Sequence, residues 1–136
     1  MGKKLKLLFL NADSGDYLNI SLLHGLKTLN NIEVIDYPKS EVSYIENREM
    51  LKKHLRGNGF TLFFNLPDNP VKRFHIKYEE LPRNEFDLIV LGDIQSNFGL
   101  YLELLPHLKF SNTAILDGSD NANLFGDSGV GWRHHY

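Results

Sequence analysis

Acidic, hydroxyl and glycine residues gather in three short polar segments, and each segment directly follows an apolar run of the sequence. Clustered carboxylates bind hard cations or accept hydrogen bonds from the hydroxyl groups of ribose and sugars. Small residues at a helix start let backbone N–H groups approach a phosphate. The three segments therefore predict a small-molecule site, and the candidate ligand-binding residues are Asp13, Ser14, Gly92, Asp93, Asp117, Gly118 and Asp120.

The same residue types are also the ordinary residues of turns and helix N-caps. Asp13 and Asp93 precede segments that we expect to be helical, so helix capping competes with ligand contact at both positions. No helix is expected after Asp117 and Asp120, which strengthens the ligand-binding interpretation there.

The apolar pattern predicts alternating strands and helices. We expect strands at residues 5–10, 32–37, 60–64, 86–91 and 113–116, and helices at 17–29, 46–54 and 97–108. Asp16 or Ser14 is the expected N-cap of the first helix, and residues 71–83 fit either a strand or a helical turn. The pattern indicates a three-layer α/β domain with a mostly parallel sheet of about five strands, in a Rossmann-like or flavodoxin-like order.

Parallel strands bring their carboxyl ends to one edge of the sheet, where ligands of such folds bind. The three polar segments are therefore expected to lie along one edge. We expect one domain over residues 1–120, followed by an irregular glycine-rich segment at 121–136.

Composition excludes several classes of function. The 136 residues carry a net charge of −2, which gives no electrostatic footprint for nucleic acid. No cysteine is present, so a disulfide framework, a cysteine-ligated zinc site and a thiol nucleophile are excluded, and no histidine pair shows metal-ligand spacing. With no cysteine and no suitably spaced histidines, we expect no metal. The first apolar run stops at Asn11 and is too short for a membrane span or a secretory signal, so we expect a cytoplasmic protein. The glycine motifs of dinucleotide-binding and phosphate-binding loops are absent.

Four stretches carry a resemblance to a known family: GFTLFFNL at residues 59–66, EFDLIVLGDI at 85–94, LLP at 104–106 and TAILDGSD at 113–120. This series, over residues 57–120, resembles the N-terminal Rossmann-like domain of glycosyltransferase-like proteins of the GT-B type. The resemblance implies two Rossmann-like domains with a cleft between them, in which the N-terminal domain binds the acceptor and the C-terminal domain binds the nucleotide-sugar. It places the family's acidic position at Asp117 and Asp120 and its glycine-acid turn at Gly92 and Asp93, and it fixes no catalytic base.

The resemblance implies an acceptor-side domain that is not active alone. Its partners are then a sugar acceptor and, if the chain is a fragment, a C-terminal donor-binding domain; the domain itself binds no cofactor, and the nucleotide-sugar is a co-substrate of the full-length protein. One alternative is a stand-alone Rossmann-like or flavodoxin-like module that binds a small ligand or a partner without catalysis. In that case flavin is disfavoured, because the first loop lacks the several hydroxyl residues that suit an FMN phosphate. The other alternative is a structural domain whose acids are only caps.

Overall fold

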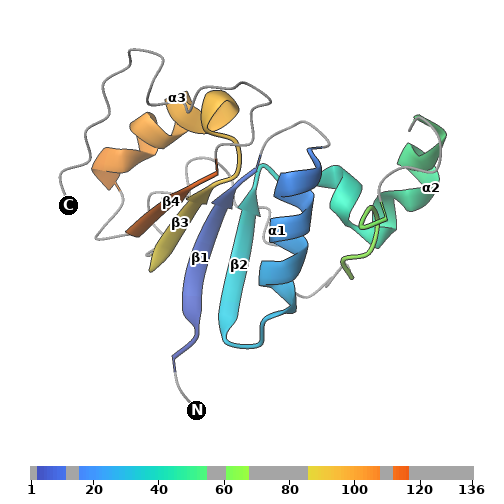
Figure 1. The fold of residues 1–136 in the computed structure, drawn as a ribbon, viewed down its shortest axis with the longest axis horizontal. Coiled ribbons are helices and arrows are strands. Elements are labelled where there is room, and N and C mark those ends of the chain that lie inside the picture. The colour runs from blue at the N-terminus through green and yellow to red at the C-terminus, as the bar shows by residue number, and fades with distance from the viewer. Residues whose placement is uncertain (1–2, 12–15, 55–60, 68–85, 108–111, 117–136) are drawn as a thin grey trace.

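A single parallel β-sheet organises the molecule. The structure, a computed structural model, describes residues 3–11, 16–54, 61–67, 86–107 and 112–116 (Figure 1). Within these residues, four strands pair in the order β2-β1-β3-β4, and every pairing is parallel. The strands are β1 (Leu5–Leu10), β2 (Ile32–Tyr37), β3 (Leu88–Leu91) and β4 (Asn112–Ile115), and the helices are α1 (Tyr17–Thr28), α2 (Arg48–Leu51) and α3 (Ile94–Leu104).

Strand β1 lies in the centre of the sheet and is buried on both faces. It pairs with β2 from Leu5↔Ile32 to Leu10↔Tyr37, and with β3 from Leu7↔Leu88 to Leu10↔Leu91. The four consecutive residues from Leu7 to Leu10 are each at most 1% exposed. A continuous apolar run, rather than an alternating one, is what a strand covered on both faces requires.

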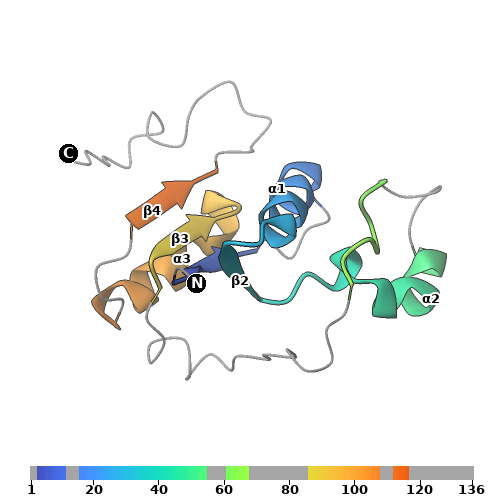
Figure 2. The ribbon, with the colours of Figure 1, turned by 90° about the horizontal axis from the view of Figure 1, so that it is seen from below.

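The two long helices cover opposite faces of the sheet (Figure 2). Leu23 of α1 packs with Leu7 and Phe9, whereas Tyr101 and Leu104 of α3 pack in the cluster that contains the residues pointing the other way from β1. Chain direction explains this arrangement, because β1–α1–β2 and β3–α3–β4 move outward from the centre in opposite directions. Right-handed crossovers then place their helices on opposite faces.

Helix α1 begins where the sequence predicts, and its buried face lies beside the predicted leucine stripe. Asp16 is its N-cap and accepts hydrogen bonds from the backbone N–H groups of Leu18 (3.2 Å) and Asn19 (3.3 Å). The predicted buried face consists of Leu18, Leu22, Leu26 and Leu29, with Leu23 beside them. Leu22 and Leu26 are partly buried against the core, but Leu18 is 43% exposed, and the fully buried residues of α1 are Asn19, Ile20 and Leu23. The buried face is therefore shifted from the leucine stripe toward Leu23, and it includes one amide side chain.

The expected strand at residues 60–64 is wrong over its described part. Residues 61–64 form turns, and Phe64 has a φ of 57°, which is incompatible with a strand. The segment pairs instead with the chain that follows β2, because Phe64 N–H donates to Val42 O (2.9 Å) and Leu66 N–H donates to Ser43 O (2.9 Å). Aromatic and β-branched residues favour a strand in isolation, but Phe64 and Leu66 are buried here beside Tyr44, outside the sheet.

The expected helix at 46–54 is present as short pieces. A 3₁₀ turn at Ile45–Asn47, α2 and a second 3₁₀ turn at Lys52–His54 follow one another, after a further 3₁₀ turn at Glu41–Ser43. Helix α3 starts three residues earlier than expected, and Leu105–His107 continue it as a 3₁₀ turn that contains Pro106. Proline lacks the N–H that an α-helix needs, which accounts for this ending.

A polar network attaches the segment after β2 to the sheet. Asp36 Oδ1 lies 2.7 Å from Lys27 Nζ and accepts a hydrogen bond from the Tyr44 hydroxyl (2.7 Å), while Asp36 Oδ2 accepts one from Ser40 N–H (3.1 Å). The Lys27 and Lys39 ammonium groups lie 5.2 and 4.3 Å from the centre of the Tyr44 ring. All acceptor positions used on Asp36 therefore serve the fold.

The predicted fold class is confirmed as a parallel α/β domain with helices on both faces, and the order β2-β1-β3-β4 is that of a flavodoxin-like sheet. The described part contains four strands, against about five expected. The ambiguous segment 71–83, the domain end at residue 120 and the segment 121–136 lie outside the described residues. No helix in the described ranges is long and apolar enough to cross a membrane.

Candidate functional site

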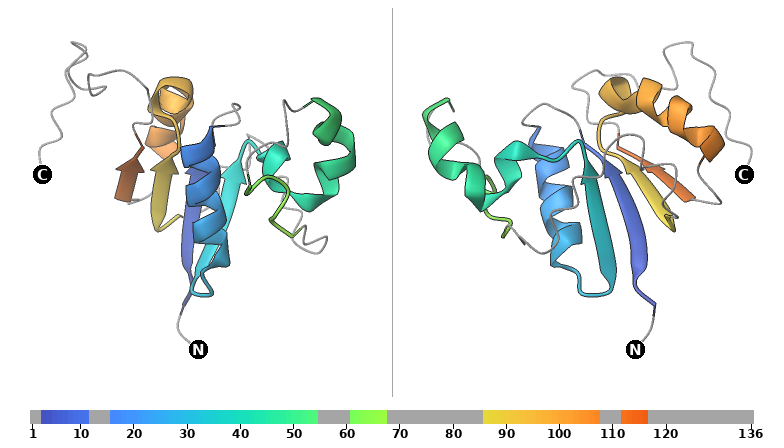
Figure 3. Two further views of the ribbon diagram at one scale, coloured as in Figure 1. Left: turned by 45° about the vertical axis from the view of Figure 1, so that its right-hand side comes forward. Right: turned by 180° about the vertical axis from the view of Figure 1, so that it is seen from behind.

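The carboxyl ends of β1 and β3 form the topological switch point of the sheet. From β1 the chain crosses to β2, and from neighbouring β3 it crosses the other way to β4 (Figure 3). The two connections diverge there, and ligands of doubly wound sheets bind at such a point. The residues that follow β1 and β3 and those that begin α1 and α3 therefore define the candidate site.

Backbone and amide groups join the two strand ends. Leu10 O accepts hydrogen bonds from Gly92 N–H (2.8 Å) and from the side-chain Nδ2 of Asn97 (3.2 Å). The same Nδ2 lies 3.1 Å from Asp93 O, and Asn97 is 4% exposed. Asn97 thus fixes the first turn of α3 against the end of β1, which makes this side of the site rigid.

Gly92 is needed because the first turn of α1 and the end of β1 come very close to it. A Cβ atom at this position would lie 2.3 Å from Asn19 Oδ1, 2.9 Å from Leu10 O and 3.0 Å from Phe9 Cε1. No side chain fits at these distances without a shift of its neighbours. The predicted ligand-binding glycine therefore has a packing role at the switch point, and its ligand contact stays a prediction.

Asn19 is the most unusual residue of the site. It is 0% exposed, and within the described part of the chain neither its Nδ2 nor its Oδ1 has a hydrogen-bond partner. Buried side-chain amides are almost always hydrogen-bonded, since an unpaired group costs about 1–3 kcal/mol. Because Oδ1 faces Gly92, the unpaired amide lies between α1 and the carboxyl end of β3.

The start of α1 is poorly suited to an anion. The N–H groups of Leu18 and Asn19, which would bind a phosphate at this helix end, already donate to the Asp16 carboxylate. Asp93 brings a second carboxylate directly before α3. Carboxylates and neutral amides at one edge favour neutral hydroxyl-bearing or cationic ligands over phosphates.

The structure describes two of the predicted site residues. Gly92 and Asp93 both follow β3 at the switch point, as expected, and Asp93 is partly buried at the position before the first residue of α3. The remaining predicted site residues lie outside the described residues: Asp13, Ser14, Asp117, Gly118 and Asp120.

Sequence reasoning missed the three asparagines of this edge. Asn11 directly follows β1 and is 5% exposed, and Asn19 and Asn97 lie in the first turns of α1 and α3. A signal for Asn19 was present, because it lies four residues before the buried Leu23 and therefore on the same side of the helix. The leucine spacing is the stronger pattern, and the buried face that it predicts does not include Asn19.

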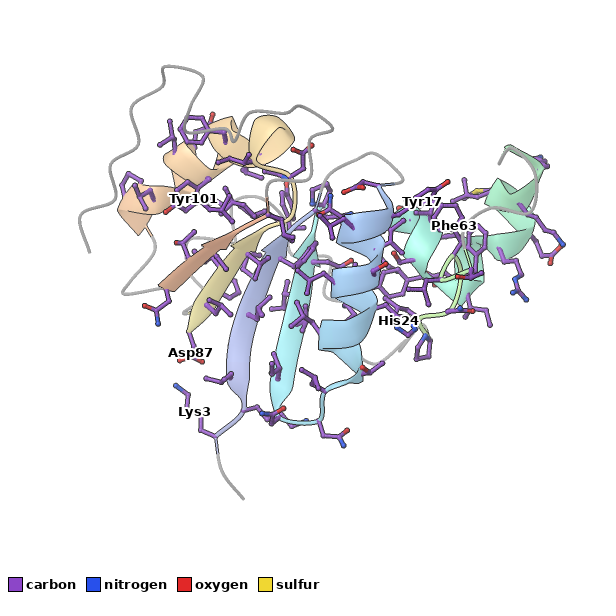
Figure 4. The ribbon with its side chains drawn as sticks, viewed as in Figure 1. Lys3, Tyr17, His24, Phe63, Asp87 and Tyr101 are labelled. Atoms are coloured by element: carbon purple, nitrogen blue, oxygen red, sulfur yellow. The ribbon has the colours of Figure 1, made fainter. Side chains whose placement is uncertain are left out.

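The opposite edge of the sheet has a different chemistry. Asp87 Oδ2 accepts a hydrogen bond from Lys6 N–H (2.8 Å), and Lys3 Nζ lies 3.6 Å from Asp87 Oδ1 (Figure 4). The Lys6 N–H bond lowers the pKa of Asp87 most, desolvation opposes it, and the charge of Lys3 lowers it further. The Asp87 carboxylate therefore stabilises the first residues of the β1–β3 pairing and has a structural role.

Among the residues that the structure describes, no group of three or more His, Cys, Asp or Glu side chains could hold a metal ion. No protein-family model, curated protein or solved structure matches this chain.

Proposed function

We propose that this chain is a small-molecule-binding α/β domain with its site at the β1/β3 switch point, and that it serves as the acceptor-side domain of a two-domain glycosyltransferase-like protein. The observation that carries the proposal is the unpaired, fully buried amide of Asn19, enclosed beside Gly92 where the two crossovers diverge. A polar group of this kind at the position where such folds bind ligands supports a binding role.

The polar groups at this edge support an acceptor rather than a nucleotide-sugar. Sugar hydroxyls pair well with carboxylates and amides, and Asp93 and Asn19 supply one group of each kind at this edge. A nucleotide-sugar brings a diphosphate, which the Asp16 carboxylate at the start of α1 opposes. On this proposal, the donor is held by another domain and the isolated chain has no transferase activity.

A titration of the ¹⁵N-labelled 136-residue chain tests the proposal. We expect glucose, galactose or N-acetylglucosamine to shift the backbone amide signals of Gly92 and Asp93. UDP-glucose should shift them no more than free glucose does. Asp93→Asn should weaken the response by about tenfold, the size of one lost charge-assisted hydrogen bond.

Glu33→Gln is the matched control, because it makes the same carboxylate-to-amide change near the amino end of β2, on the opposite edge. It should leave the response unchanged. A response to UDP alone would instead support the stand-alone binding module. If none of these compounds shifts the two signals, the acids of this edge are helix caps and the proposal fails.

A further inference from the structure

We infer that Asn19 is the residue that reads the ligand of the switch-point site, by forming a donor–acceptor pair with two neighbouring hydroxyl groups of a neutral carbohydrate. The inference rests on the proposed function for the kind of ligand. It rests on the structure for the residue, since Asn19 is 0% exposed with both amide atoms unpaired.

Packing of α1 against the core does not require an amide side chain at position 19. Ile20 and Leu23, the other buried residues of α1, have the apolar side chains that this face of the helix requires. A leucine at position 19 would have the same branched shape without an unpaired polar group, and replacing buried polar groups by apolar groups of the same shape can be nearly neutral or stabilising. The fold alone therefore gives no reason for an amide there.

The chemistry of an unpaired amide defines what it recognises. Nδ2 offers donors and Oδ1 offers an acceptor side by side, so the complementary group must present an acceptor and a donor side by side. Adjacent hydroxyl groups of a sugar do this without charge. A phosphate offers acceptors only and would leave Oδ1 unpaired.

Access to Asn19 requires a rearrangement of the first turn of α1. Both amide atoms are covered and Oδ1 faces Gly92, so the ligand pairs with them only after the side chain rotates or this turn moves away from β3. The free protein leaves the amide unpaired, and the bound protein pairs it. Ligand binding and movement of the first turn are therefore coupled.

The experiment compares Asn19→Leu with the wild-type chain in two measurements. In urea unfolding, Asn19→Leu should keep a single transition with an unchanged slope, because removal of the unpaired amide offsets the larger methyl groups of leucine and the variant still folds. In the titration with glucose, galactose and N-acetylglucosamine, the same variant should lose the response at Gly92 by at least about tenfold.

The wild-type chain gives a readout that does not depend on any variant. Binding should shift the side-chain NH₂ signals of Asn19. The signals of Asn47, whose side-chain amide donates to Glu41 on the surface, are the control and should not shift. If the sugars shift Gly92 equally in wild type and Asn19→Leu, the inference is wrong and the proposed function stands. If no sugar shifts any signal of the wild type, the proposed function fails and the inference fails with it.

Discussion

At the scale of single residues, the switch point depends on a glycine and an asparagine that constrain each other. Because Gly92 has no side chain, Asn19 Oδ1 can lie where a Cβ atom at position 92 would collide with it. Asn19 in turn prevents a larger residue at position 92. The sequence shows Gly92 as a candidate because a glycine follows an apolar run. Its sign for Asn19 is weaker: the spacing of four residues places Asn19 on the same side of the helix as Leu23, but an asparagine near a helix start is usually a surface residue.

Gly92→Ala should destabilise the protein by about 1–3 kcal/mol, because the added Cβ would lie 2.3 Å from Asn19 Oδ1 and forces a shift of the backbone or the amide. Urea unfolding measures this change. Gly99→Ala is the control: no atom lies within 4 Å of its added Cβ, so in the interior of α3 it should stabilise by about 1 kcal/mol. Equal effects of the two substitutions would contradict the packing role of Gly92.

Asp87 predicts a pH dependence of stability. Its pKa is lowered from the ordinary value of 3.8, chiefly by the Lys6 N–H bond, so the folded state binds a proton less readily than the unfolded state. The contribution of Asp87 to stability is therefore present above pH 3.8 and is lost as the pH falls through the lowered folded-state pKa. Asp87→Asn should flatten the acid limb of a plot of urea midpoint against pH. An unchanged acid limb would refute this assignment.

At the scale of elements, most strands follow from their sequences, and the exceptions have specific causes. The runs at 5–10 and 32–37 are strands with the expected bounds, because continuous apolar or β-branched sequence suits a buried parallel sheet. The run at 60–64 is also strongly apolar, but residues 61–64 pair with residues 42–43 and form turns. Local composition does not specify which neighbour a segment pairs with, and tertiary contacts decide it.

The Lys27–Asp36 ion pair connects α1 to β2, and we expect its loss to destabilise the protein more than the loss of the Lys39–Glu46 pair. The Lys27 and Asp36 side chains are 20% and 6% exposed, so Lys27→Met leaves a buried carboxylate without its cation and should cost about 3 kcal/mol in urea unfolding. The double variant Lys27→Met/Asp36→Asn should recover much of this loss. Lys39→Met removes the cation beside Glu46, whose side chain is 26% exposed and therefore more accessible to water than that of Asp36, and should cost about 1 kcal/mol or less. A similar loss in both single variants would disprove the special role of the buried pair.

At the scale of the whole molecule, the two diverging crossovers place the candidate site at the centre of the sheet. The sequence predicts correctly that Gly92 and Asp93 follow a parallel strand at this edge, and their contact with a ligand stays a prediction. It does not predict the burial of Asn19 and Asn97, because this burial results from the approach of α1 to Gly92 and of α3 to the end of β1, and these segments are distant in the sequence. The titration with sugars and UDP-glucose tests which class of ligand binds at the carboxyl ends of β1 and β3.

The position of β1 between β2 and β3 also has a consequence for the order of folding. The β1–α1–β2 unit closes within residues 5–37, whereas Lys6 and Asp87, at the start of the β1–β3 pairing, are 81 positions apart. Local contacts form earlier than distant ones, because closing a long loop costs more chain entropy. During synthesis, β1 therefore acquires its first neighbour and one covering helix well before β3 emerges. Until then, the apolar side chains of Leu8 and Leu10, which the finished protein covers with α3, remain exposed on the nascent chain.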